Sequence, residues 1–526
     1  ALANLDSEDT WEQHFADTYI EGYGLGDPSS IEIMAKEAPE LVKEIDSWGA
    51  NFDRLDDGSF DQRFFGAHTY RRTCYSADST GKVIINALLK KIDELNIKIK
   101  DSQYVTELLI KDGECFGAFA FDIYNGQKNL YLADAVILAT GGNTGIWKRS
   151  SSRRDENTGD GIYLALQSGC KLIDMEMVQF HPTGMLFPEE VAGALVTEAV
   201  RGEGGKLFNI NNERFMVKYD PERLELSTRD RVSIANYTEI IQGRGTQNGG
   251  VYLDISHLSK NLIIKKLPTI YRKFIELQML DISKNSMEVA PTAHYSMGGV
   301  YVNAEDHSTS IKGLFACGEV AGGLHGANRL GGNSLAEILV FGKRAGKFAS
   351  IYSKNINIKL RDNLVIDKSN KKINDAIHKG NEIGRKLEFE IKELMWTNCG
   401  VLKNKDQMDE ALIKIKTFKE RFKNIDVRVD GDNFSDLIIK FNIEASLYSA
   451  EATLISALSR KESVGAHQRE DFPKLNTTKK VNYLIEMDNK KNLIVSEKNC
   501  PKLSKKIAKF VNNTYKIKSF KGRLIE

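Results

Sequence analysis

The sequence lacks the features that would assign it at once to a membrane-spanning or nucleic-acid-binding class. No apolar run approaches the roughly 18 to 20 residues that span a bilayer, and no basic segment followed by an apolar one opens the chain. The charges nearly cancel, with 73 Lys and Arg against 72 Asp and Glu, so the overall charge predicts neither a nucleic acid nor an anionic membrane as partner. Any site for an anion must therefore be local.

Cysteine is also scarce, and the sequence contains no C-x-x-C pair. Widely spaced cysteines are typical of reduced thiols in a cytosolic compartment, and they lack the close spacing of structural metal sites. We therefore predict reduced thiols and no metal. The cysteines are Cys74, Cys115, Cys170, Cys317, Cys399 and Cys500.

The length leaves room for several domains. With 526 residues and 41% hydrophobic content, the chain is long enough for about two to four domains with buried cores. It starts at Ala1 without Met and runs into a polar stretch that becomes an amphipathic helix. We expect the natural N-terminus to lie upstream.

The first part of the chain has helical periodicity, over residues 8–50, interrupted at GYGLGDPSS. Ser29 or Ser30 is predicted to cap the second helix, and Gly49 to end it. The glycines of 22–27 follow a helix and lack the Gly-x-Gly-x-x-Gly spacing. They predict an interhelical turn and not a dinucleotide loop.

A predicted helix over 80–97 is followed by alternating strands with DG and NG turns. The last strand, 135–139, is continuous and apolar, which is typical of a strand buried on both faces. It ends at Gly141 and Gly142, and a later NTGDG contains Asp160. This pattern favours a doubly wound sheet whose strand ends face a nucleotide, although glycine turns after strands are common on their own.

A stronger signal is the glycine-rich segment GLFACGEVAGGLHGANRLGGNSLAE. Its strand ends at Glu319, a position suited to binding the sugar hydroxyls of a dinucleotide. A helix follows, with Asn333 or Ser334 as the predicted N-cap, and its free N–H groups favour an anion. A tight turn alone would not explain His325 and Arg329 within the segment.

Polar residues from separate loops form a candidate dicarboxylate clamp. His181 and His294 both lie in Gly/Pro-rich segments that are predicted to be loops, and Arg329 offers a planar fork that matches a carboxylate. Thr197 adds a neutral donor. A single loop histidine is more often an ordinary surface residue.

Charged residues nearby admit two interpretations. Glu198 and Arg201 are three residues apart and are neighbours if helical, as in an ordinary surface ion pair. Arg229 stands at the predicted start of a helix beside Asp230 and Arg231, which could be simply a charged first turn.

Taken together, these motifs have an order and spacing similar to the flavoprotein subunit of succinate dehydrogenase and fumarate reductase. They are ATGG, NTGDG, QFHPTG, TEAVRGEGG, NNERF, TRD, HYSMGG, LHGANRLGGNSL and ESVGAHQREDFP. The resemblance implies an α/β fold in which an FAD-binding doubly wound sheet carries an inserted α+β capping domain, followed by a helical domain and a small C-terminal domain. The implied boundaries are 1–175 and 294–353 for the FAD-binding domain, 176–293 for the capping domain, 354–460 for the helical domain and 461–526 for the C-terminal domain.

The resemblance also implies a chemistry, the transfer of a hydride between FAD and succinate or fumarate with a proton transfer at the adjacent carbon. Arg229 would transfer the proton, and Glu198 and Arg201 would form its relay. Guanidinium is a poor acid by its pKa, so the proton must go to a developing carbanion and be replaced. The implied substrate-binding residues are His181, Thr197, His294, Arg329, Phe65 and Gly66. The implied FAD contacts are Asp160, Glu319, Ser334, Leu335, Gly141 and Gly142.

The implied partners are an iron–sulfur protein subunit that passes electrons to a quinone and, indirectly, membrane anchor subunits. The chain would then be cytoplasmic and peripheral on the cytoplasmic face of the membrane. Two departures from the family stand out. Its Gly-x-Gly-x-x-Gly βαβ unit and the histidine that carries covalent FAD precede the region where this chain starts, so the isolated chain is expected to hold FAD weakly or not at all. Val464 also stands where an arginine is common.

Two alternatives remain open from the sequence. An L-aspartate oxidase belongs to the same superfamily, although LGGNSL and TEAVRGEGG favour the succinate and fumarate enzymes. The other alternative is a catalytically silent fragment built of the capping and helical domains.

Overall fold

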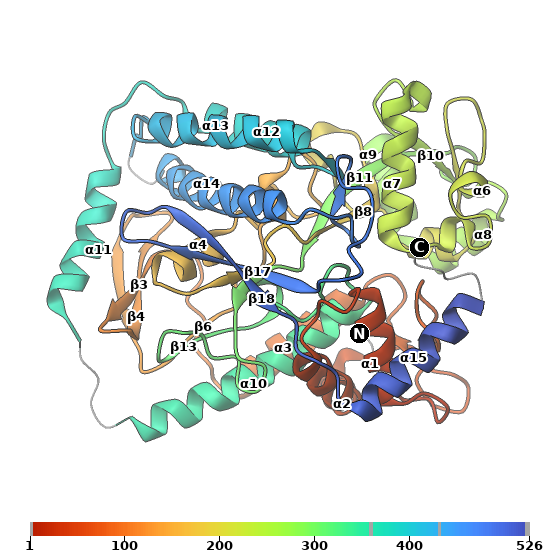
Figure 1. Ribbon diagram of the computed structural model, residues 1–526, viewed down its shortest axis with the longest axis horizontal. Helices are drawn as coiled ribbons and strands as arrows, with labels where there is room; N and C mark the ends of the chain where they lie inside the picture. Colours follow the sequence, from red (N-terminus) through yellow and green to blue (C-terminus); the bar gives the residue numbers. More distant parts are fainter. Residues whose placement is uncertain (1–3, 357–360, 430–432, 521–526) are drawn as a thin grey trace.

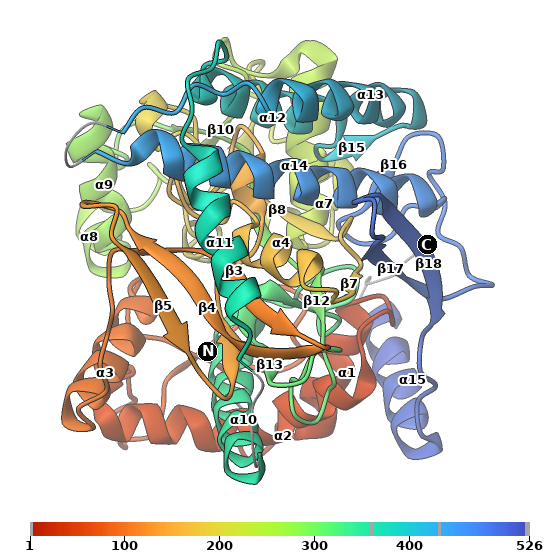
Figure 2. The ribbon, with the colours of Figure 1, turned by 90° about the vertical axis from the view of Figure 1, so that its left-hand side faces the viewer.

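The computed structural model describes residues 4–356, 361–429 and 433–520, without the side chains of 515–520. Helices and short sheets alternate along the chain (Figures 1 and 2). None of the helices in these ranges combines the length and the apolar character needed to cross a bilayer.

A group of helices from distant parts of the chain packs together at the bottom of Figure 1. Phe15, Ile31, Val42 and Phe341 are buried in their shared core. The C-terminal helix contacts the first helix of the chain. The group comprises α1 (Trp11–Glu21), α2 (Pro28–Ile45), α3 (Thr80–Glu94), α10 (Asn333–Asn355) and α15 (Lys505–Phe520).

The N-terminus of α2 corrects the predicted cap. Asp27, not Ser29 or Ser30, is the N-cap, and its carboxylate accepts hydrogen bonds from the backbone N–H groups of both serines at 2.9 and 3.1 Å. Pro28 occupies the first helical position, which has no need of an N–H, so the cap falls one residue before it. Gly49 lies in the turn after the helix with φ of 105°, as predicted for its end.

The predicted meander is confirmed as an antiparallel sheet of β3 (Gln103–Lys111), β4 (Glu114–Asp122) and β5 (Lys128–Leu132). Helix α11 crosses this sheet in Figure 2. Strand β6 (Val136–Leu138) follows and pairs in parallel with β13 (Leu314–Ala316).

The expected burial of both faces of β6 is wrong. Leu138 is 4% exposed and packs into a core, but Ile137 is 38% exposed. Successive side chains of a strand point to opposite faces, and only the face that carries Leu138 is packed.

A second sheet has the order β8 (Val178–Met185), β11 (Met287–Ser296), β10 (Val251–Asp254) and β9 (Lys206–Phe208), all antiparallel. Helix α7 (Arg229–Glu239) lies beside β8 and β11 (Figure 1). Helices α8 (Lys260–Lys266) and α9 (Pro268–Gln278) complete this part, around a core of its own.

The predicted helical region contains α11 (Asn363–Ala376), α12 (Gly384–Asn398), α13 (Lys405–Phe422) and α14 (Ser435–Ser459), which share one core. Near the C-terminus, β17 (Val481–Met487) and β18 (Leu493–Asn499) form an antiparallel hairpin, which belongs to a five-stranded sheet with β7 (Leu172–Ile173), β12 (Gly299–Tyr301) and β14 (Ala321–Gly322). The remaining short elements are α4 (Asp160–Gln167), α5 (Ala199–Gly202), α6 (Met216–Tyr219), β1 (Gln62–Arg63), β2 (Thr73–Cys74), β15 (Leu402–Lys403) and β16 (Gln468–Arg469).

Candidate active site

The two candidate histidines lie on paired strands and not in loops, which corrects the prediction. His181 is in β8 and His294 in β11, and their rings meet edge to face with centroids 5.2 Å apart. The β8–β11 register is irregular near both residues. Bulges of this kind accommodate the prolines that made these segments look like loops.

Both histidines are neutral at pH 7. Burial lowers the pKa of His181 well below its usual value, and Arg229 lowers it further. Burial also lowers the pKa of His294, with His181 next in importance. Nδ1 of His181 accepts a hydrogen bond from the backbone N–H of Thr183 at 3.2 Å, so the proton of this neutral ring is on Nε2.

Arg229 is the first residue of α7, as the sequence predicted. Its Nε donates to Oε2 of Glu198 at 2.7 Å. Nη2 of Arg201 lies 3.9 Å from the same carboxylate oxygen. Arg201 is 1% exposed and the Glu198 side chain 12% exposed, which excludes the surface-pair interpretation.

Glu198 is a buried carboxylate that stays ionised. Burial alone would raise its pKa, but the positive charges of Arg229 and Arg201 hold the pKa at about 2. Nη1 of Arg201 donates to the backbone carbonyl of Glu225 at 2.5 Å, while its Nε and Nη2 have no hydrogen-bond partner among the described residues. The cluster therefore has more buried donors than acceptors.

Arg329 approaches the same cluster from the glycine-rich segment. Its Nη1 donates to Oγ of Ser334 at 3.3 Å, and its guanidinium lies 4.4 Å from the centroid of the Tyr295 ring. Within the part of the chain that the structure describes, Nε of Arg329 has no hydrogen-bond partner. Burial, and then repulsion by Arg229, lower the pKa of Arg329 to about 10.

Gln179 is a member of the cluster that the sequence reasoning did not single out. Its Oε1 accepts from Nη1 of Arg229 at 3.3 Å and from Nη2 of Arg329 at 3.0 Å. It precedes His181 by two positions in the same strand, so both side chains point to one face of β8. Alternation within QFHPTG is the signal that could have identified it.

The remaining predicted substrate residues lie around this cluster. A Cβ added to Gly331 would lie 3.2 Å from Cδ2 of Phe65 and 3.6 Å from Nη2 of Arg229. A Cβ added to Gly66 would lie 3.8 Å from Oε1 of Glu198. Thr197 directly precedes Glu198, and its hydroxyl accepts a hydrogen bond from the backbone N–H of Ala199 at 3.4 Å.

Several residues predicted to contact the cofactor converge beside Arg329. Oε1 of Glu319 accepts from the backbone N–H of Ser296 at 2.9 Å, and burial raises the pKa of Glu319 to about 7. A Cβ on Gly142 would approach that oxygen to 2.6 Å, so only glycine fits there. Ser334 and Leu335 begin α10, whose N-cap is Gly332, so the predicted caps Asn333 and Ser334 are wrong.

Gly141 and Asp160 lie in a separate cavity of about 730 Å³. Gly141 has φ of +75°, and Asp160 begins α4, where burial raises the pKa of its carboxyl. Thr140, Asn157 and Thr158 also line this cavity. This cavity therefore lies at the end of β6, where the sequence predicts a bound nucleotide.

Comparison with known proteins matches two family models, an FAD binding domain over residues 1–335 and a fumarate reductase flavoprotein C-terminal model over residues 388–511. One subunit of the CoM/CoB fumarate reductase of Methanothermobacter marburgensis is 44% identical, covering 90% of this chain and 86% of that protein. The succinate dehydrogenase flavoprotein subunit of Rickettsia conorii is 36% identical, covering 90% and 83%.

Solved structures agree with these relatives. Sdh1 of Mycobacterium smegmatis in complex with UQ1 has a TM-score of 0.87 at 36% identity, covering 96% of this chain and 88% of the other. A quinol-fumarate reductase with menaquinol molecules has a TM-score of 0.91 at 32% identity, covering 96% and 90%. The chain belongs to the flavoprotein subunit family of succinate dehydrogenase and fumarate reductase. The expected fold class is confirmed with it.

FAD is the cofactor of this flavoprotein, and its residues fit that group. Gly142 lets the carboxyl of Glu319 and the hydroxyl of Ser296 approach the backbone at the end of β6, because a Cβ there would lie 2.6 Å from the oxygen of the first and still closer to that of the second. The buried carboxyls of Glu319 and Asp160 are suited to accept hydrogen bonds from ribose or ribitol hydroxyls. Ser334, in the first turn of α10, accepts a hydrogen bond from Arg329 through its hydroxyl.

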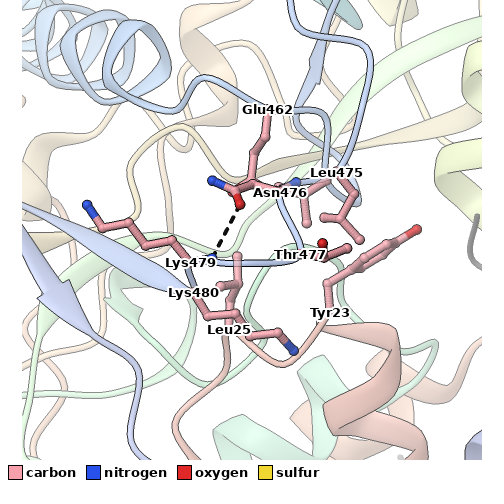
Figure 3. A pocket seen from close by; sticks show the side chains of 9 residues that line it. Tyr23, Leu25, Glu462, Leu475, Asn476, Thr477, Lys479 and Lys480 are labelled. Atoms are coloured by element: carbon pink, nitrogen blue, oxygen red, sulfur yellow. Dashed lines mark hydrogen bonds between the residues drawn. The ribbon is translucent and has the colours of Figure 1, made fainter.

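Val464, the departure noted in the C-terminal block, lies elsewhere. It lines a hollow of about 210 Å³ between the turn after α1 and the C-terminal region. Tyr23, Leu25 and Lys480 line the same hollow (Figure 3). The side chain of Val464 is buried, at 2% exposed, and the residues of the flavoprotein's charged cluster do not line this hollow.

Proposed function

We propose that this flavoprotein interconverts succinate and fumarate. The observation that carries the proposal is a buried excess of donors, in which Arg201 and Arg229 share the carboxylate of Glu198 and Arg329 lies beside Arg229. Arg329 retains a buried Nε with no partner in the described chain. A dicarboxylate supplies the negative charges and acceptors that this cluster needs.

The proposed roles in binding follow from the donors. Arg329 binds one substrate carboxylate, and the neutral His181 and His294 donate hydrogen bonds to the substrate, with Thr197 as a further donor. Fixed donors stabilise the negative charge that develops on the carboxylate side of fumarate during reduction. Phe65 and Gly66 are proposed to border the substrate, since Gly66 lies beside Glu198 and Phe65 lies beside Gly331, which is also close to Arg229.

Arg229 is the proposed proton donor to the substrate carbon in fumarate reduction. Its contact with Glu198 at 2.7 Å, and the position of Arg201 at 3.9 Å from the same carboxylate, support a relay Arg201–Glu198–Arg229 that replaces the lost proton. FAD, when bound, supplies the hydride transfer that accompanies this proton transfer. The low pKa of Glu198 keeps it ionised, so it stabilises the cationic form of Arg229.

The proposed electron partner is an iron–sulfur protein subunit that connects the flavoprotein to a quinone, with peripheral attachment to a membrane on its cytoplasmic face through anchor subunits. Sdh1 in complex with UQ1 and the menaquinol-bound fumarate reductase support this partner class. A second candidate is a thiol-linked fumarate reductase. The 44% identity to a subunit of the CoM/CoB fumarate reductase of M. marburgensis supports this candidate, since the solved structures that contain UQ1 or menaquinol are 36% and 32% identical.

The test is to assay the purified holoenzyme with three substrate pairs. Fumarate with a reduced viologen dye and succinate with an artificial acceptor should both give turnover, whereas L-aspartate with oxygen should give none. Turnover with aspartate alone would identify an L-aspartate oxidase instead. Comparison of a quinol with a pair of coenzyme thiols as electron donor then separates the two electron sources.

A further inference from the structure

Gln179 occupies the space between two guanidinium groups of equal charge. Its Oε1 accepts from both Arg229 and Arg329, at 3.3 and 3.0 Å, and Gln179 is fully buried. Arg229 and Arg329 repel each other, as the lowered pKa of Arg329 reflects. A neutral acceptor shared by both holds them at a fixed separation without cancelling the positive charge that a dicarboxylate needs.

The orientation of the Gln179 amide is set by Asn328. Nε2 of Gln179 donates to Oδ1 of Asn328 at 2.7 Å and to the backbone carbonyl of Arg329 at 3.0 Å. Nδ2 of Asn328 donates in turn to Oε1 of Glu21 at 2.7 Å and to Oδ1 of Asp230 at 3.0 Å. Asn328 is 1% exposed and Asp230 6% exposed, so this chain of hydrogen bonds is shielded from water.

The orientation of the two amides follows from the carboxylates at the end of this chain of hydrogen bonds. The oxygens of Glu21 and Asp230 accept from the nitrogen of Asn328, so the oxygen of Asn328 faces Gln179. Gln179 must then turn its nitrogen to Asn328 and its oxygen to the two arginines. Reversing either amide would set N–H groups against N–H groups in a buried site, at the cost of an unsatisfied hydrogen bond.

We infer that Gln179, oriented by Asn328, is a positioning residue that sets the distance between the proton donor Arg229 and the carboxylate clamp Arg329. This inference rests on the proposed interconversion of succinate and fumarate. Arg329 has two further supports, the Ser334 hydroxyl and the Tyr295 ring. Loss of Gln179 should therefore displace Arg229 relative to the substrate more than it weakens substrate binding.

The test measures fumarate reduction by the holoenzyme in Gln179→Met, Asn328→Leu and the double variant. We expect kcat to fall about 10- to 100-fold in Gln179→Met, with KM changed less than about threefold, because a displacement of about 1 Å is enough for such a loss. The double variant should be no slower than Gln179→Met, since Asn328 acts through Gln179. Gln167→Met, the same substitution on the outer end of α4, is the control and should leave kcat unchanged.

An unchanged kcat in Gln179→Met, or losses that multiply in the double variant, would overturn the inference. Gln179→Glu provides a second test if the methionine variant does not fold. Its carboxylate still accepts hydrogen bonds from Arg229 and Arg329, but its negative charge offsets part of their positive charge. KM for fumarate should therefore rise about tenfold or more. Unchanged KM in Gln179→Glu also contradicts the inference. Failure of the wild-type enzyme to reduce fumarate would contradict the proposed function instead.

Discussion

Two buried clusters of this protein contain arginines, and they differ in the balance between guanidinium groups and carboxylates. Around Arg72, Nε and Nη2 donate to both carboxylate oxygens of Asp9 at 2.7 and 2.8 Å, and Nη1 donates to Asp17 at 2.7 Å. One arginine there faces two carboxylates. Around Glu198, one carboxylate faces Arg201 and Arg229, and Arg329 lies nearby.

The direction of the arginine pKa separates the two clusters. Burial alone would lower the pKa of Arg72, but its hydrogen bonds to Asp9 and the charge of Asp17 raise it. Burial lowers the pKa of Arg329, and Arg229 lowers it further. Two carboxylates thus offset the charge of Arg72, whereas the cluster around Glu198 keeps guanidinium charge that its carboxylate does not balance, as expected of the proposed anion site.

The largest expected effect is on turnover in Arg229→Lys. An ammonium group cannot reproduce the contacts of Nε with Glu198 and of Nη1 with Gln179. Succinate oxidation and fumarate reduction should both fall at least about 1,000-fold, equivalent to about 4 kcal/mol of transition-state stabilisation, while malonate affinity and FAD content stay close to wild type. Turnover within tenfold of wild type would remove Arg229 from the proton transfer.

The comparison of the clusters is tested most directly by matched substitutions of two buried arginines. Arg72→Met leaves Asp9 and Asp17 buried without their partner and should lower the free energy of unfolding by about 3 kcal/mol. Arg201→Met removes one of several repelling charges and should lower it by at most about 1 kcal/mol, although turnover is lost. Chemical denaturation of both variants measures the difference. Equal losses of stability would show that the two clusters do not differ in this way.

Much of the site could be predicted from the sequence, because its chemistry is carried by local motifs. Arg229 does begin a helix, but the strand of GLFACGE ends at Ala316, three residues before Glu319, which lies in the following 3-10 turn. The glycine-rich segment does bring Arg329 to the other charged residues. Local patterns were sufficient for these, since caps, strand ends and charged turns depend on neighbouring residues.

The features of the site that the sequence did not predict depend on contacts between distant segments. His181 and His294 were predicted in loops because prolines and glycines suggest turns, but the pairing of β8 with β11 absorbs them in bulges. The role of Gln179 requires two arginines from different elements, α7 and the glycine-rich segment, to converge on one amide. The position of the α2 cap, in contrast, was readable from Pro28 and was missed.

A smaller effect is expected on substrate binding when a residue of the proposed dicarboxylate clamp is replaced by alanine. Arg329→Ala should weaken malonate binding about 10- to 100-fold, and His294→Ala about tenfold, because the first removes a charge-assisted contact and the second a neutral one. Titration of the flavin absorbance with malonate measures both. Arg428→Ala, which removes an exposed arginine of the helical region, is the control. Unchanged affinity in Arg329→Ala would mean that this guanidinium does not contact the dicarboxylate.

The smallest expected effect is on the pH dependence of stability, and it tests whether Glu198 is the counter-ion of its cluster. Its pKa of about 2 in the folded protein lies below the usual glutamate value of 4.5. The stabilisation that it provides is therefore fully present above about pH 4.5, and it is lost as the pH falls toward 2. The difference in free energy of unfolding between wild type and Glu198→Gln should shrink by about 1 kcal/mol between pH 7 and pH 4.

The opposite pH dependence of this stability difference would contradict the role of Glu198 as counter-ion. If that difference grew as the pH fell, Glu198 would bind its proton more tightly in the folded than in the unfolded protein, and burial would outweigh the attraction of Arg229 and Arg201. Glu420→Gln, at an exposed ion pair with Lys423, controls for the loss of one carboxylate at the surface. A shrinking difference in Glu198→Gln alone would show that this carboxylate is held ionised by arginines whose charge it only partly balances, so the remaining charge is available to a bound dicarboxylate.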